Sequence, residues 1–239
     1  MKNQLAWFKS LPFGLTVRLI SLYLVRKVFR IPVTFSFSQG AEDIILGYLP
    51  LSGTGTYVDV GCNEPVRFSN TFNLYLQGWR GINIDANSEL INKCKKIRKR
   101  DISICAAVSD TEREVTFHKA KISSVSTIDE ERLVEWKKLW TFAEEDKETV
   151  ITRTLTSILD ENLTAGSQID LLSIDDEGHD FQVLKSLDLA RYKPKVIIIE
   201  IHTIDKISET DIYQYLSANG YKLKYYAVLN AYFVDKDLE

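Results

Sequence analysis

The chain has 239 residues, 45% of them hydrophobic and 26% charged, a composition that excludes disordered and fibrous proteins. Its formal net charge of −3 argues against a general nucleic-acid binder, whose surface would be basic. Three cysteines, Cys62, Cys94 and Cys105, are too few for a disulfide framework, which favours a reducing, cytoplasmic compartment.

The N-terminal part of the chain differs from the rest in charge. Residues 1–41 contain six basic side chains and no acidic one, whereas the remaining residues contain 24 bases and 33 acids, a balance of −9. We therefore separate a basic, apolar helical segment, residues 1–36, from a main domain, residues 37–239. Arg18 interrupts the apolar stretch, and the charge-free runs on either side are shorter than the ~20 residues of a membrane-spanning helix.

Two structures for residues 1–36 agree with this pattern. In the first, the segment is a helix that packs on protein, which is either its own domain or a second copy of the chain in a homodimer. The alternative is a basic amphipathic helix that lies peripherally on the anionic inner face of a membrane. A signal peptide is not indicated, because neither an unbroken apolar region nor a small-residue cleavage site is visible.

From residue 37 onward, short apolar runs alternate with amphipathic stretches, a pattern typical of βαβ units around a parallel sheet. Predicted strands span residues 56–60, 81–84, 102–108, 169–174 and 195–201. One predicted helix ends near residue 49, and four others span residues 70–77, 88–98, 181–187 and 208–219. Ser88 is expected to cap the third of these helices, and six bases between Lys93 and Arg100 are expected to form a solvated helix face.

An insert around residues 113–154 is expected to interrupt these units. It contains extra strands at residues 113–118 and 149–154 and an acidic helical stretch at residues 128–146, whose aromatic residues form either a small core or a wall for a sugar ring. Two final strands, residues 221–228 and 231–234, flank Asn230 and predict a hairpin. The result is a doubly wound, mostly parallel α/β sheet with a C-terminal antiparallel hairpin, which binds ligands at the carboxyl ends of its strands.

The first two strands end in residues suited to a nucleoside with a positive charge. Gly61 lets the backbone turn, and Asn63 tolerates a left-handed conformation where a dinucleotide-binding loop would have its second glycine. Asp59 would repel a phosphate but suits an ammonium group, and Asp85 is placed to accept hydrogen bonds from two ribose hydroxyls. S-adenosylmethionine combines these two features.

Acidic residues also follow the fourth and fifth strands. Residues 175–180 contain four acids and His179, which must be solvated, bound to a metal or part of a site. Glu200 and His202 alternate at the end of the Ile-rich fifth strand, so both face one side of the sheet. A carboxylate in such a strand favours a role in a site.

Several motifs in sequence order resemble the FkbM-type methyltransferases over roughly residues 37–203: residues 38–43, 57–85, 106–110 and 169–200. The resemblance implies a class I, Rossmann-like methyltransferase that uses S-adenosylmethionine. By position, Asp59, Gly61 and Asn63 resemble the loop at the methionine end, Asp85 the ribose acid, and Ala107 the adenine wall. Asp175, Glu177 and Gly178 resemble the Asp-x-Glu-Gly element beside the reacting centre. The chain departs from the family pattern at Pro65, where glycine is usual, and at Asp180, where glutamate is usual.

The sequence therefore predicts an O-methyltransferase that acts on a sugar hydroxyl of a glycan or a glycosylated metabolite. The candidate catalytic residues are Asp175, Glu177, His179 and Glu200, with proton transfer to Asp175 or His179. Asp175 and Glu177 could instead hold a divalent cation, which would lower the pKa of the hydroxyl. The alternatives are a nucleotide-dependent oxidoreductase or epimerase on a related sheet, or a non-catalytic binding module of the same fold.

Overall fold

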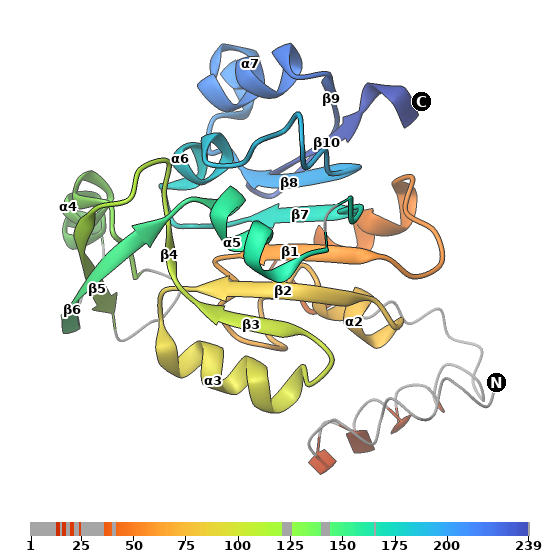
Figure 1. The fold of residues 1–239 in the computed structure, drawn as a ribbon, viewed down its shortest axis with the longest axis horizontal. Coiled ribbons are helices and arrows are strands. Elements are labelled where there is room, and N and C mark those ends of the chain that lie inside the picture. Colours follow the sequence, from red (N-terminus) through yellow and green to blue (C-terminus); the bar gives the residue numbers. More distant parts are fainter. Residues whose placement is uncertain are drawn as a thin grey trace.

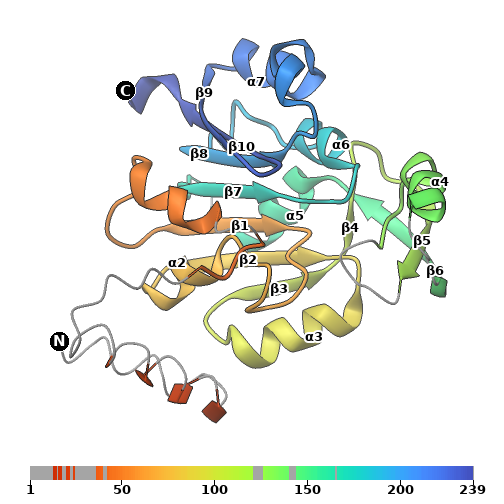
Figure 2. The same cartoon turned by 180° about the vertical axis from the view of Figure 1, so that it is seen from behind.

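The computed structural model describes residues 13–14, 16–17, 20–21, 24, 36–39, 42–120, 126–139, 144–164 and 166–238. These residues form a seven-stranded sheet in the order β3-β2-β1-β7-β8-β10-β9 (Figures 1 and 2). The strands are β1 Thr56–Val60, β2 Arg80–Asp85, β3 Ile102–Cys105, β7 Leu171–Ile174, β8 Val196–Glu200, β9 Tyr221–Ala227 and β10 Asn230–Asp235. The first five pair in parallel, whereas β10 runs antiparallel to both of its neighbours. The predicted fold class, a doubly wound, mostly parallel α/β sheet with a C-terminal antiparallel hairpin, is confirmed.

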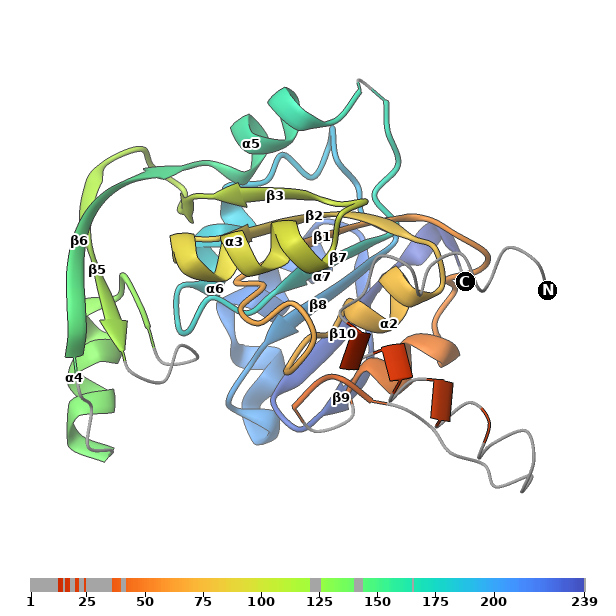
Figure 3. The same cartoon turned by 90° about the horizontal axis from the view of Figure 1, so that it is seen from below.

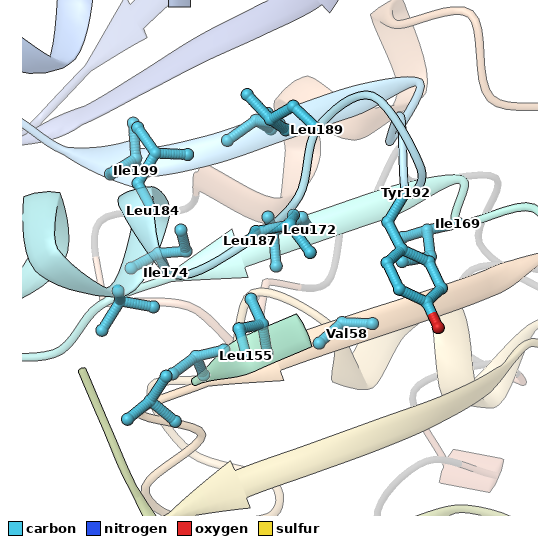
Figure 4. Close-up of a cluster of buried hydrophobic side chains, with 14 of the residues drawn as sticks. Val58, Leu155, Ile169, Leu172, Ile174, Leu184, Leu187, Leu189, Tyr192 and Ile199 are labelled. Carbon is cyan, nitrogen blue, oxygen red and sulfur yellow. The ribbon is translucent and has the colours of Figure 1, made fainter. Parts of the chain in front are cut away.

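Helices cover both faces of this sheet. Tyr57 of β1 packs in a cluster with residues of η2 (Glu42–Tyr48) and α2 (Phe72–Leu76), and α3 (Ser88–Ile97) lies on this same face. Val58 and Val60 point the other way and pack against α5 (Leu155–Asn162), α6 (Asp180–Lys185) and α7 (Asp211–Ala218), as Figure 4 shows in part. A parallel sheet buried on both faces explains why its strands read as continuous apolar runs.

A second, smaller sheet lies at one end of the large one. Its strands in the described residues are β4 Ala107–Val108, β5 Glu114–Ala120 and β6 Glu144–Arg153, in the order β4-β6-β5. Helix α4, Glu130–Leu139, connects β5 to β6. Figure 3 shows β5, β6 and α4 together beyond one end of the large sheet. The connection therefore projects from the same end as the loops that follow β7 and β8, a placement that the contacts of Arg132 below confirm.

Two element predictions were wrong in this region, and one helix was missed. The predicted strand at residues 102–108 divides into β3 and β4, because β3 pairs with β2 and β4 pairs with β6. The predicted helical stretch at residues 128–146 ends at Leu139, and the strand β6 already begins at Glu144. Helix α5 was not predicted, although Thr154 caps it with a side-chain hydrogen bond to the backbone N–H of Ser157. Trp140 and Phe142 lie outside the described residues.

Element boundaries differ from the predictions where polar side chains satisfy backbone groups. Asn87, and not Ser88, caps α3 by accepting a hydrogen bond from the N–H of Glu89 at 3.0 Å. Thr210 caps α7 in the same way and separates it from the 3-10 helix η4 (Ile204–Glu209). The predicted hairpin is confirmed, but its turn is Val228–Leu229, because Asn230 already pairs with Ala227. The chain continues into a further 3-10 helix, η5 (Lys236–Leu238).

The described residues of the N-terminal segment, residues 13–14, 16–17, 20–21 and 24, are helical. No helix within the described part of the chain combines the length and the apolar character needed to cross a membrane. The remaining residues before position 36 lie outside the description, so the boundary predicted at residue 36 stays a prediction.

Candidate active site

The site lies where β1 and β7 are neighbours in the sheet. From β1 the chain continues to β2 and β3 on one side, and from β7 it continues to β8 on the other. Such a switch in strand order opens a crevice at the carboxyl ends of the two strands, where ligands bind in doubly wound sheets. The predicted residues Gly61 and Asp175 each follow one of these strands directly.

Gly61 brings the two strand ends into contact. Its φ of 70° lies in the left-handed region, and a Cβ atom at this position would be 1.9 Å from the carbonyl oxygen of Asp175. A backbone oxygen cannot move as a flexible side chain can, so only glycine fits here. The loop after β1 is thereby packed directly against the loop after β7.

Asn63 and Asp85 fix the other side of this loop. Asn63 has a φ of 47°, as predicted, and its backbone N–H donates to Oδ2 of Asp85 at 2.9 Å. The second carboxylate oxygen of Asp85 accepts from the N–H of Asn87 at 2.8 Å. Burial raises the pKa of Asp85 to about 6, although these two hydrogen bonds oppose the shift. Asp85 is therefore held rigidly at the end of β2, in the place expected for a ribose-binding acid.

Asp59 lies beneath the loop and is engaged by protein groups. Its side chain is only 6% exposed, accepts a hydrogen bond from the hydroxyl of Thr71 and lies 3.7 Å from Nη1 of Arg98. Burial raises the pKa of Asp59, and the charge of Arg98 partly offsets this effect. Direct contact between Asp59 and an ammonium group stays a prediction; the structure shows a carboxylate that supports the loop.

Arg98 was missed as a functional candidate, since its basic stretch was predicted to be solvated. Its side chain is fully buried and donates to four acceptors, three in the loop between β1 and α2 and one in β2: the carbonyl of Pro65, Oγ of Ser69, Oγ1 of Thr71 and Oδ1 of Asn83. The spacing of residues could have predicted this burial, because Arg98 lies seven residues after Ile91 and four after Cys94, on the buried face of α3. Arg98 thus ties the loop after β1 to β2 and to the start of α2.

Four carboxyl groups lie at or just after the ends of β7 and β8. Asp175, Glu177, Asp180 and Glu200 interact electrostatically, and burial together with Glu200 raises the pKa of Asp175 well above its ordinary value. Burial and Glu200 also raise the pKa of Glu177, to about 8. Glu177 has a φ of 50°, a strained conformation for this residue that the sequence did not indicate. The structure thus brings three predicted catalytic residues into one cluster.

His179 is not part of this cluster. Its ring is 4% exposed, and Nε2 lies 2.9 Å from the hydroxyl of Ser109, while Nδ1 lies 4.0 Å from Asp129. Burial lowers the pKa of His179, and the charged groups that act on it lie outside the carboxylate cluster. The prediction that His179 takes a proton from the acceptor therefore has no support in this arrangement.

Helix α4 adds Arg132, which the predicted site lacked, and Trp136, one of the aromatic residues predicted to form a small core or a wall for a sugar ring. Nη2 of Arg132 lies 4.0 Å from Oε2 of Glu200 and contacts His202, whose Nε2 is 3.1 Å from the same carboxylate oxygen. The guanidinium group of Arg132 also lies 5.3 Å from the ring centroid of Trp136. Nearby, the hydroxyl of Thr127 donates to the carbonyl of Glu177 at 3.3 Å. The segment between β5 and β6 therefore reaches over the carboxylate cluster.

Two further predictions concern the adenine wall and a metal. Ala107 is buried in β4, and the preceding residue, Ala106, donates its N–H to the carbonyl of Asp85 at 3.0 Å. This contact places Ala107 beside the ribose-binding candidate, and its role stays a prediction. No group of three or more metal-ligating side chains is found among the described residues, so the cation suggested for Asp175 and Glu177 lacks a preformed site there.

Comparisons with known proteins give one family match and two structural neighbours. Residues 59–223 match the methyltransferase FkbM domain, a range that contains every candidate residue of the site. A TehB-like SAM-dependent methyltransferase from Corynebacterium glutamicum has a similar structure, with 13% identity, a TM-score of 0.43 and coverage of 90% of this chain and 96% of that one. Precorrin-6y C5,15-methyltransferase from Geobacter metallireducens is 11% identical, with a TM-score of 0.40 and coverage of 80% of this chain and 84% of that one. No curated protein matches the chain.

Proposed function

Because the chain belongs to the FkbM methyltransferase family, an S-adenosylmethionine-dependent class, we propose that its acceptor is a sugar hydroxyl of a glycan or a glycosylated metabolite. The family assignment leaves the oxidoreductase and epimerase alternatives without support. The observation that carries the sugar proposal is the polar and aromatic surface that α4 and β8 form beside Asp175 and Glu177.

The residues at the strand ends fit S-adenosylmethionine. When bound, this cofactor supplies a methyl group on a positively charged sulfur, which an oxygen nucleophile can take up. Asp85 offers a fixed carboxylate for the ribose hydroxyls, and the carboxylates of Asp175 and Glu177 provide a negative environment for a cationic ligand. A positive charge in the crevice would in turn favour the ionised form of these carboxyl groups.

Proton removal is assigned to the cluster around Asp175. A sugar hydroxyl is a poor nucleophile at neutral pH, so a base must take its proton as the new bond to carbon forms. Asp175 follows β7 at the crevice, and its raised pKa makes its carboxylate a stronger base than an ordinary aspartate. Asp180 holds this loop in place through hydrogen bonds from the N–H groups of Asp176 and Gly178.

The acceptor subsite is assigned to the surface over Glu200. Two buried polar atoms there form no hydrogen bond with any described residue: Nε of Arg132 and Nε1 of Trp136. Buried polar atoms normally have partners, and a ligand with several hydroxyl groups would supply them. An indole ring beside charged groups suits the apolar face and polar edge of a sugar.

The proposal is tested by identifying what the enzyme methylates. Surface glycans are compared by mass spectrometry between cells with and without the gene, and we expect one sugar to lose an O-methyl group. The purified enzyme should then transfer labelled methyl groups to glycan from the deletion cells. Glycan from wild-type cells, in which the hydroxyl is already blocked, serves as the matched control. Label on protein alone, or on neither glycan, would contradict a sugar acceptor.

Asp85→Asn is expected to weaken S-adenosylmethionine binding by roughly ten- to a hundredfold, because the ribose hydroxyls lose a charged acceptor. Calorimetric titration measures this effect, with Asp160→Asn, an exposed carboxylate beside Arg191, as the control. Asp85 accepts protons as the pH falls through its pKa of about 6, so wild-type affinity should decrease below that pH. An Asp85→Asn protein that is folded and binds like the wild type would exclude this residue from the ribose site.

A further inference from the structure

The described residues of the N-terminal helix expose an apolar stripe. Phe13, Val17, Ile20 and Leu24 are 84%, 48%, 37% and 50% exposed. At about 100° per residue, these four positions fall within about 60° of one another around the helix. Side chains of this kind normally face a core, so a helix that turns them outward presents a surface for something else.

The charge of the same part of the sequence narrows the choice of partner. Residues 1–41 contain six bases and no acid, whereas the rest of the chain has a balance of −9. An apolar stripe within a basic stretch of sequence is typical of helices that lie in a membrane interface. The apolar stripe enters the boundary between headgroups and acyl chains, and the cations bind anionic headgroups.

We propose that the stripe formed by Phe13, Val17, Ile20 and Leu24 lies in the interface of an anionic lipid membrane and holds the methyltransferase domain at its surface. The inference is independent of the acceptor, since it depends only on the exposed stripe and the excess of cations. A second copy of the chain fits this surface less well. A second copy that presented its own stripe would bring the same six cations to the contact and repel the first, whereas anionic lipids bring the opposite charge.

The full chain is tested on sedimenting vesicles of phosphatidylcholine mixed with phosphatidylglycerol, and on vesicles of phosphatidylcholine alone. We expect binding to the anionic vesicles at low salt and release as salt is raised, because salt screens the attraction. The double variant Val17→Ser, Leu24→Ser should bind these vesicles at least about tenfold more weakly. Both side chains are exposed, so folding and S-adenosylmethionine binding should be unchanged.

Ile151→Ser is the matched control, because Ile151 of β6 is also apolar and 68% exposed but lies outside the stripe. It should bind anionic vesicles like the wild type. The proposal is overturned if the wild-type chain does not bind anionic vesicles at low salt, or if the double variant binds as well as Ile151→Ser. It is also overturned if the double variant abolishes a dimer of the chain while vesicle binding persists, since the stripe would then be a protein interface.

Discussion

Asp175→Asn is expected to lower the rate of methyl transfer by about two to four orders of magnitude and to leave S-adenosylmethionine affinity little changed. Asparagine keeps the shape of the side chain but cannot accept the proton of the acceptor hydroxyl. The fold should tolerate the change, because burial and the neighbouring Glu200 already disfavour a charge at Asp175 and thereby raise its pKa. Replacing a buried, repelled carboxyl group with a neutral amide removes repulsion from the cluster.

Glu177→Gln separates the roles of the two neighbouring carboxyl groups. In the free enzyme, kcat/KM should rise with pH up to about pH 8, since the cluster around Asp175 and Glu177 must lose a proton to act as a base. The neutral amide would remove a negative neighbour and lower the pKa of Asp175, so the rise should move to lower pH with activity retained. A loss of activity at every pH would instead make Glu177 the base.

Asp110→Asn is the control for both variants, because Asp110 is a carboxylate paired with Lys185 at 2.8 Å outside the cluster. Rates are measured with and without EDTA for each protein. If Asp175→Asn turns over normally, the reacting centre is not at the end of β7, and our assignment is wrong. If EDTA abolishes wild-type activity, the carboxylates act first as metal ligands.

Gly61→Ala is expected to weaken S-adenosylmethionine binding by at least about a hundredfold and to destabilise the fold. The new methyl group would lie 1.9 Å from the carbonyl oxygen of Asp175, so the ends of β1 and β7 would have to separate. The left-handed φ of 70° adds roughly 1–2 kcal/mol of strain for any residue with a Cβ atom. Thermal unfolding and calorimetric titration measure the two effects separately.

Gly53→Ala is the matched control for this variant. Gly53 has a φ of 68°, close to that of Gly61, but a Cβ atom there would meet nothing within 4 Å. It should lower Tm by only a few degrees, as backbone strain alone requires, and bind S-adenosylmethionine like the wild type. Equal effects at the two positions would show that the close approach between the strand ends does not shape the pocket.

Local features of the sequence were sufficient to predict much of the fold and part of the site. Strand β1 was predicted at its observed bounds, because a short apolar run that ends in glycine has one plausible structure in an α/β chain. The left-handed conformation of Asn63 followed from its position after Gly61. Asp85 and the acids of residues 175–180 were found for the same reason, since carboxyl ends of parallel strands carry the site wherever the sheet is doubly wound.

Features that depend on distant contacts were not predicted. Arg98 resembled the other solvated bases of its helix, and its burial depends on four acceptors that the fold brings together from the loop after β1 and from β2. Arg132 reaches Glu200 and His202 across roughly 70 residues of sequence. His179 was predicted as an alternative base to Asp175, but the fold places its ring against Ser109, outside the carboxylate cluster. No periodicity along the chain encodes such placements.

The pairing of β1 with β7 affects folding as well as chemistry. The N–H of Thr56 donates to Asp170, 114 residues later, so this seam joins two halves of the sheet that are made far apart in time. Contacts across so long a loop form late in folding, and a seam of this kind opens before the strands within each half. A ligand that contacts residues on both sides of the seam binds only when the seam is closed, and its binding free energy stabilises the closed state. The level of folded enzyme in a cell should therefore depend on the supply of its cofactor, because protein with the seam open is removed by proteases.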